Sequence, residues 1–454
     1  MNQQTIKKTD TRDYHVDNIK GVLIILVVCG HLLSTLQDMD STFAIGVRTL
    51  IYFFHMPGFI FMSGYLAKGF LKKEYKGEKL LSYAWLYLFF KNAIDLVHLI
   101  FRRPYFAGGS HTLELVLIVA LFCFGIWLLS QLYSRFPAFR NGLILLVVAY
   151  SLLKTNVLTV GAAPWYLMAL IWFHIIVYLT RNIQPKYVLA AAVLLSAFIN
   201  YQDTVGKFLT LSRAANFLPF FLLGFYLKRE HFEKVVNHPK WKHFLSILFL
   251  ISAVVITLNG RGISKWLGVF FYGVSPYSKL LKLGEWYYNI APLTCILWMT
   301  VTVLILFGLF ALCPRKKTFM AKLGRNTIGI YILHRLFKDF LIYGGFYDIL
   351  SKNEYLAVGE TLLVSLLLAV VFGTDFCAKT MNKLSVVNAK WMYKKYYQKD
   401  YERYLIYMIN VLMICHGNPN GSVLNPAKPW QIAVNRGLCT VQTTQKLPFS
   451  IFFA

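Results

Sequence analysis

The sequence predicts an all-α integral membrane protein, a multi-pass bundle of helices. Of its 454 residues, 57% are hydrophobic and 15% are charged, and the mean hydropathy is +0.53. A soluble domain carries roughly 45–50% apolar and about 25% charged residues. Aromatic residues reach 17%, which is typical of side chains that sit at membrane interfaces. Long apolar runs recur between short polar segments, so the apolar excess is organised into spans.

Twelve apolar segments are candidate spans. Several of them fall short of the ~20 residues that a full crossing needs, so some crossings are expected to be short. In chain order the segments are 21–36, 47–67, 80–101, 112–133, 142–157, 164–180, 187–201, 215–228, 242–258, 290–312, 327–344 and 355–377.

The net charge is +27, and the positive charges are distributed as expected for a membrane protein of defined topology. With the N-terminus in the cytoplasm, lysines and arginines are more than twice as frequent in the cytoplasmic segments as in the outer ones. Because cytoplasmic loops are enriched in these residues, we expect both termini in the cytoplasm and the chain in the plasma membrane. The basic stretches KKEYKGEK, KREHFEKVVNHPKWK and PRKK fall on that side, where topology and lipid headgroups explain them better than nucleic acid does.

The two ends of the chain differ from its apolar middle. Residues 1–20 are polar and of mixed charge, so we expect a cytoplasmic segment followed by a retained first span rather than a signal peptide. Residues 378–454 are expected to form a basic cytoplasmic segment and a weakly ordered tail. The apolar stretch YLIYMINVLMI within this region is too short to cross a bilayer.

The sequence contains no signature of a metal or nucleotide site. The seven cysteines are scattered without a CxxC pair, so neither a zinc site nor a disulfide framework is expected. Walker, GxGxxG, GxSxG and HExxH patterns are missing from the sequence as well. We therefore expect no metal and no ATP-driven activity within this chain.

The first span contains a pair of ionisable residues in the run DNIKGVLIILVVCGHLL. Lys20 and His31 lie about 16 Å apart along a helix at ~1.5 Å per residue, and Asp17 lies on the same face as Lys20. A neutral imidazole inside a membrane helix can accept a proton from a hydroxyl. The alternatives are a lysine that snorkels to the interface and a histidine that packs between helices.

Two further spans carry histidines. In FFHMPGFIFMSGY, His55 precedes a proline that breaks the helical hydrogen-bond ladder, which favours a helix that lines a cavity. In GRNTIGIYILHRLFKD, His334 lies about two turns inside the helix. His174 has no distinctive neighbours, and a structural role is expected for it. Together these histidines predict a polar interior suited to an active site or to a transport pathway.

Three outer segments are candidates for substrate contact. Residues 259–289 form a long segment that could be a lid, a substrate rim or a plain surface loop. The other two are 102–111 and 201–214, and the latter places Arg213 at the end of a span, where it could bind an anion or simply anchor the helix.

Several motifs, taken together and in order, resemble the membrane acyltransferase family 3, and most of all its fucose 4-O-acetylase-related branch. They are DNIKGVLIILVVCGH, FFHMPGFIFMSGY, PWYLMALIW, SRAANFLPFFLLGFYL and GRNTIGIYILH, within residues 12–377. The resemblance implies about ten core spans in an acyltransferase domain of residues 21–377. Residues 112–157 look like an added helix pair, which would raise the number of spans to twelve.

The resemblance also implies a reaction and a set of residues. It implies transfer of an acetyl group from acetyl-CoA, as co-substrate, to a hydroxyl of a carbohydrate or glycan precursor. The family's Arg/Lys-x10-His motif matches Lys20 and His31, which suggests His31 as base or acyl carrier and Lys20 as its partner near the donor. The remaining expected site residues are His334 as a catalytic residue and Arg213, His55, Lys79 and Asp17 in donor or acceptor binding.

Two other functions remain open on the residues alone. A proton-coupled small-molecule transporter would also use intramembrane histidines and a kinked helix. A non-catalytic membrane scaffold would tolerate alanine at Lys20, His31 and His334 with no change beyond stability.

Overall fold

The computed structural model describes residues 12–37, 41–72, 76–101, 112–153, 158–160, 164–387, 430–435 and 438–443. The chain divides into two compact units, Met1–Asn388 and Ala389–Ala454. The predicted outer segment 102–111 and most of the predicted tail lie outside the described residues.

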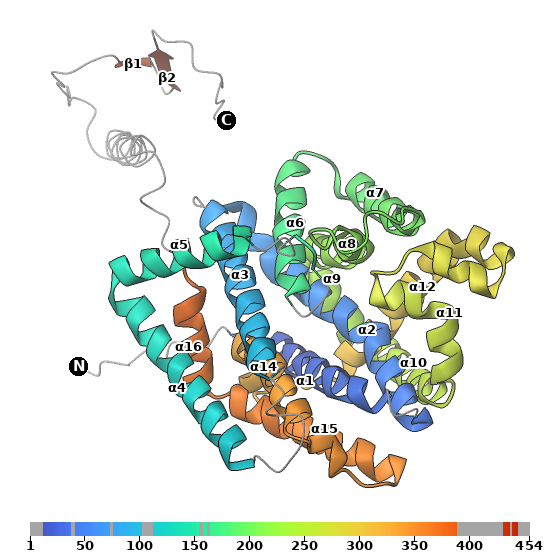
Figure 1. Cartoon of the computed structure of the whole chain (residues 1–454). Coiled ribbons are helices and arrows are strands. Elements are labelled where there is room, and N and C mark those ends of the chain that lie inside the picture. The colour runs from blue at the N-terminus through green and yellow to red at the C-terminus, as the bar shows by residue number, and fades with distance from the viewer. Residues whose placement is uncertain are drawn as a thin grey trace, which may run out of the picture. The chain divides into compact units, whose positions relative to one another are not determined.

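The described part of the first unit is helical, and Figure 1 shows the arrangement of its elements. Its α-helices are α1 (Tyr14–Gln37), α2 (Thr42–Leu66), α3 (Lys76–Phe101), α4 (Thr112–Arg135), α5 (Pro137–Leu153), α6 (Trp165–Leu179), α7 (Pro185–Phe198), α8 (Leu211–Tyr226), α9 (Arg229–Asn237), α10 (Pro239–Leu258), α11 (Gly260–Tyr272), α12 (Glu285–Leu312), α13 (Phe319–Arg325), α14 (Thr327–Tyr343), α15 (Glu354–Phe372) and α16 (Asp375–Ser385). Short 3₁₀ helices are η1 (Ala67–Lys72), η3 (Ile199–Tyr201), η4 (Tyr277–Leu283) and η5 (Phe346–Asp348).

The predicted all-α multi-pass membrane architecture is confirmed. Each of the twelve predicted spans overlaps an α-helix. Within the described ranges, seven helices are long and apolar enough to cross a membrane, namely α1, α2, α3, α4, α10, α12 and α15. Three further apolar helices are shorter, namely α5, α6 and α7, of which α6 has 15 residues and α7 has 14. For α8 and α14, which are helices of 16 and 17 residues with polar side chains, a membrane crossing remains a prediction.

Burial separates central helices from peripheral ones. In the most apolar stretch of α1 and of α2, 61% and 67% of the residues are buried inside the protein, against 11% in α4 and in α10. Figure 1 shows α4 and α5 as a hairpin at one edge of the first unit. The hairpin corresponds to residues 112–157, whose status as an added pair remains a prediction. The first unit extends past residue 377 to Asn388, and α16 packs against α4 and α14.

The crossing of α2 and α8 depends on two glycines. A Cβ atom at Gly64 would overlap the carbonyl oxygen of Phe221, and one at Gly224 would overlap that of Phe61. Small residues at such positions let the backbones of membrane helices approach closely. The glycines therefore fix the distance between α2 and α8.

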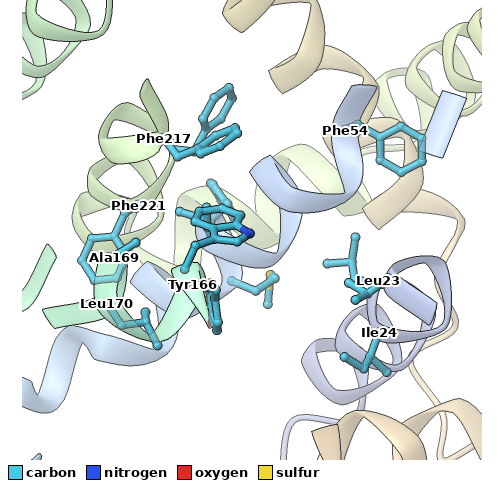
Figure 2. Packing of buried hydrophobic residues seen from close by; sticks show 14 of the residues in the cluster. Leu23, Ile24, Phe54, Tyr166, Ala169, Leu170, Phe217 and Phe221 are labelled. Carbon is cyan, nitrogen blue, oxygen red and sulfur yellow. The ribbon is translucent and has the colours of Figure 1, made fainter. Parts of the chain in front are cut away.

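Large apolar side chains fill the space between the central helices. Figure 2 shows Leu23 and Ile24 of α1 near Phe54 of α2, and Ala169 and Leu170 of α6 near Phe221 of α8; these residues belong to one buried cluster. The rings of Phe173 and Phe221 stack with their centroids 4.7 Å apart.

The segment 259–289 is largely helical rather than an irregular loop. Ile263, Leu267 and Phe270 recur at helical spacing on α11 and pack into the core. The helix ends at Gly273, whose φ of +63° favours glycine. In the following η4, the hydroxyl of Tyr277 donates to the carbonyl oxygen of Ala197 at 3.1 Å, and burial raises the pKa of this tyrosine.

The described part of the second unit is a β-hairpin. Strands β1 (Trp430–Asn435) and β2 (Leu438–Thr443) pair antiparallel, with Trp430 opposite Thr443.

Candidate active site

The structure gathers three of the predicted histidines around one point between α1, α2 and α14. The ring centroids of His31 and His334 lie 5.3 Å apart. Tyr52 connects this pair to His55, with centroid distances of 6.5 Å to His31 and 4.8 Å to His55. Residues separated by 24 and by 279 positions in the sequence thus form one cluster.

A glycine beside His31 permits this arrangement. A Cβ atom at Gly30 would lie only 3.0 Å from the ring of Tyr52 and 3.1 Å from the side chain of Ile51. A larger residue would therefore press on the side chains of Tyr52 and Ile51, which would have to shift by a few tenths of an ångström.

Hydrogen bonds to the backbone fix the orientation of two of the rings. Nδ1 of His55 and Nδ1 of His334 each lie 2.7 Å from a carbonyl oxygen four residues earlier, that of Ile51 and that of Ile330. Because a carbonyl oxygen only accepts, Nδ1 must carry the proton, and Nε2 of the neutral ring keeps its lone pair.

Nε2 of His334 is a buried acceptor. Within the described part of the chain it has no hydrogen-bond partner. Buried polar atoms are normally satisfied, and an exception in a polar cluster calls for a partner such as a substrate or a water molecule. His31 differs from His334 and His55 because it is half-buried, whereas they are fully buried.

A cavity of about 550 Å³ lies one helical turn beyond the histidine pair. Its lining includes the cations Arg48 and Lys338, together with hydroxyl groups of Ser34, Thr35 and Ser264. Nζ of Lys338 donates to Oγ of Ser34 at 2.7 Å, and this hydroxyl donates to the carbonyl oxygen of His31 at 2.6 Å. The cavity wall is therefore connected directly to the backbone of His31.

Aromatic rings hold two arginines beside the cavity. The guanidinium of Arg48 lies 4.6 Å from the ring centroid of Tyr52 and 5.3 Å from that of Tyr272. Nε of Arg213 donates to the carbonyl oxygen of Tyr272 at 3.2 Å, and its guanidinium lies 5.0 Å from the ring of Trp165. Nη1 of Arg213 is buried and makes no hydrogen bond within the described residues.

The predicted residues Lys20, Asp17 and Lys79 lie apart from this cluster. His31 follows Lys20 by eleven positions, which is about 16 Å along α1. Asp17 accepts from Arg12 at 2.6 Å and from Lys20 at 3.5 Å. Lys79 lies over the rings of Phe70 and Tyr83, at 5.9 and 5.6 Å from their centroids.

A row of tyrosines leads from Lys79 towards the histidines. Tyr83 packs against His174 of α6 with centroids 5.5 Å apart, and the hydroxyl of Tyr166, also on α6, lies 2.5 Å from Oγ of Ser63. Tyr166 and Tyr331 have centroids 5.6 Å apart, and Tyr331 lies 6.4 Å from His334. We call Tyr83, Tyr166 and Tyr331 the tyrosine row.

Sequence reasoning missed four residues that lie next to the histidine cluster, namely Arg48, Tyr52, Tyr272 and Lys338. Two signals were available: Arg48 is a charge within an apolar run, and Lys338 follows His334 by four residues, which places both on one helix face. His174 stays outside the cluster and packs against Phe70 with centroids 4.6 Å apart. In the described ranges no group of three or more His, Cys, Asp or Glu side chains is placed to hold a metal ion.

Comparison with known proteins identifies the class. The acyltransferase domain of the acyltransferase 3 family matches residues 13–374, so the chain belongs to this family of membrane acyltransferases. The predicted membership of the acyltransferase 3 family is thereby confirmed, and it favours a transferase over the transporter and scaffold alternatives, whereas the fucose 4-O-acetylase-related branch stays a prediction.

Two relatives match over a short region. The nodulation protein NolL of Sinorhizobium fredii is 47% identical over 62 residues, which are 13% of this chain and 17% of the relative. The protein of the same name from Mesorhizobium japonicum is 46% identical over 63 residues, with the same coverage of both chains. The chain thus covers only 17% of the length of these curated relatives. No solved structure matches.

Proposed function

We propose that this protein is an O-acetyltransferase of the plasma membrane. It would transfer an acetyl group from acetyl-CoA to a hydroxyl of a carbohydrate or cell-surface glycan precursor, as in the fucose 4-O-acetylase-related branch. The observation that carries the proposal is the pair His31–His334, 5.3 Å apart, between a cavity and the tyrosine row.

The proposed reaction needs one base and balances without a further reactant. His31 removes the proton from the acceptor hydroxyl while the oxygen attacks the thioester carbonyl carbon. The carbon–sulfur bond then breaks, and the proton passes from the imidazole to the leaving thiolate. The half-buried position of His31 suits it to meet the acceptor, and Nε2 of His334 supplies a fixed acceptor atom beside it.

Charge that develops on the thioester oxygen requires a hydrogen-bond donor. Arg213 has a buried Nη1 without a hydrogen bond in the described structure, and such preorganised donors stabilise oxyanions strongly in a site of low dielectric. His55 holds Tyr52 against the pair and would contribute to substrate binding.

The donor would approach from the opposite end of the bundle. Lys20 and Lys79 are the cations that we propose for the phosphates of acetyl-CoA, on the cytoplasmic side, with Asp17 orienting Lys20 at 3.5 Å. The thioester arm would lie along Tyr166 and Tyr331 towards His334.

The test is acetyl transfer by the purified protein. Full-length protein in lipid nanodiscs is mixed with [14C]acetyl-CoA and a glycolipid extract, and label in the extract is counted. His31→Ala should lower the transfer rate at least about 100-fold, the usual contribution of a general base. His15→Gln is the matched control, because His15 is a buried histidine of the same helix whose Nε2 bonds to the carbonyl oxygen of Phe310 at 2.8 Å.

Near-native transfer by a well-folded His31→Ala protein would exclude the assigned base. Uptake of a solute into proteoliposomes without any acetyl transfer would favour the transporter instead.

A further inference from the structure

Arg48 and Lys338 in the cavity wall indicate which chemical class of acceptor the cavity binds. We infer that the acceptor carries an acidic group, a carboxylate or a phosphate, beside the hydroxyl that is acetylated, and that Arg48 and Lys338 bind this group. The inference rests on the proposed function and adds the class of its acceptor.

The first support is the position of the cations relative to the reacting pair. Lys338 follows His334 by four residues, so it lies on the same face of α14 about 6 Å further along the axis. Ser34, which accepts from Lys338, follows His31 by three residues on α1. A sugar that presents one hydroxyl to His31 would therefore bring a substituent from the far side of its ring to Lys338.

The second support is the preorganisation of Arg48. Its guanidinium carbon lies 4.6 and 5.3 Å from the ring centroids of Tyr52 and Tyr272, so two rings restrict the position of the group. A planar guanidinium matches the two oxygens of a carboxylate or phosphate.

The third support is the composition of the cavity lining that the structure describes. Asp339, next to Lys338, accepts from Arg335 at 2.6 Å and from His98 at 3.0 Å. The lining residues that the structure describes include two cations and no carboxylate. With a volume of about 550 Å³, the cavity is of ordinary size for a small ligand.

Three acceptor probes that differ only at C6 test the inference. They are methyl glucuronoside, methyl glucoside 6-phosphate and methyl glucoside, and their dissociation constants are measured from thermal stabilisation of the full-length protein in nanodiscs. At least one acidic probe should bind about tenfold or more tightly than the neutral one, since a hydrogen bond to a charged group contributes about 1.5–3 kcal/mol. Comparing the affinities of the two acidic probes shows whether the cavity prefers a carboxylate or a phosphate.

Variants connect the preference to the cavity. Arg48→Gln and Lys338→Gln should each reduce the preference to less than about threefold, whereas Arg48→Lys and Lys338→Arg should keep part of it. Lys265→Gln is the matched control, because Lys265 is an exposed cation next to the lining residue Ser264. If the cations served only the oxyanion, the Gln variants would lower kcat equally for all probes and leave the affinities unchanged.

Equal affinity for the neutral and acidic probes, or a preference that survives in both Gln variants, would overturn the inference. Acetyl transfer is measured in parallel with [14C]acetyl-CoA. If the neutral probe is acetylated and the acidic probes bind no more tightly than it does, the proposed function is supported and this inference is excluded. If the acidic probes bind more tightly but no probe or glycolipid is acetylated, the proposed function is excluded and the cavity is an anion-binding site.

Discussion

At the scale of single residues, three histidines of the apolar helices share one local pattern with different outcomes. His55, His174 and His334 all place Nδ1 2.7 Å from the carbonyl oxygen four residues earlier. The pattern fixes the tautomer wherever it occurs, but only His334 also lies beside His31. The local bond prepares an acceptor atom, and the neighbouring helix decides whether that atom meets a substrate.

A variant that keeps the Nδ1 donor of His334 but lacks the Nε2 acceptor tests whether Nε2 meets the substrate. Asn can replace the donor at Nδ1 but has no acceptor at the position of Nε2, so His334→Asn should fold with a melting temperature close to native. Its acetyl transfer should fall about 10²–10⁴-fold if Nε2 takes part in proton transfer. A folded His334→Asn protein with native turnover would assign the residue to packing alone.

Asp339 stabilises the helix that carries His334 and Lys338. Its carboxylate is 6% exposed and accepts from Arg335, which is 13% exposed, and from His98. Removing one partner of a buried ion pair leaves the other charge uncompensated, at a cost of about 3–5 kcal/mol. Asp339→Asn should therefore lower the melting temperature of the detergent-solubilised protein markedly, whereas the exposed Asp348→Asn should not. Equal melting temperatures for both variants would contradict this role.

At the scale of elements, close helix contacts decide which side chains meet. Gly64 and Gly224 bring the backbones of α2 and α8 together, and Gly30 of α1 leaves room for the side chains of Tyr52 and Ile51 of α2. Since α2 contributes Arg48, Tyr52 and His55 and α8 contributes Arg213, the two contacts of α2 set the geometry of the whole site.

An alanine at one contact glycine tests this dependence. Gly224→Ala places a Cβ atom against the carbonyl oxygen of Phe61, and overpacking of this kind typically costs about 1–3 kcal/mol. We expect a lower melting temperature and reduced acetyl transfer. Gly125→Ala in α4 is the matched control, because a Cβ atom there meets nothing within 4 Å and alanine favours helix. The same loss in both variants would show that the contact is not the cause.

The elements also show where sequence reasoning succeeds. Each of the twelve segments selected by hydropathy overlaps an α-helix, because burial in lipid or protein requires long apolar runs. It left α11 within an undivided outer segment, since this helix is only 13 residues long and its apolar face is interrupted by polar residues.

The site was predictable only in part. His31, His55 and His334 stand out because an ionisable group within an apolar run is costly. Arg48 and Lys338 were not selected, because their roles depend on the rotation and crossing of helices that are distant in sequence. The separation of Lys20 from the cluster, by contrast, follows from helix geometry alone.

At the scale of the whole molecule, the distribution of positive charge predicts an orientation. The segment between α12 and α13 is basic and should lie in the cytoplasm, as should both termini, whereas the segment between α14 and α15 should lie outside. Alkaline phosphatase fused after Lys352 should be active and the same enzyme fused after Lys317 inactive, with green fluorescent protein giving the opposite pattern. Activity of the phosphatase at Lys317 would reverse the orientation and with it the side from which the donor approaches.

The short helices beside the site have a consequence for the surrounding lipid. α6 has 15 residues and spans about 22 Å, whereas the hydrocarbon core of a bilayer is about 30 Å thick. A helix shorter than the hydrocarbon core creates a hydrophobic mismatch, which the membrane relieves by thinning locally. If α6 crosses the membrane, the proposed acetyl transfer would take place where the bilayer is thinned. Turnover is then expected to depend on the acyl-chain length of the host lipids, which reconstitution in lipids of different chain length would measure.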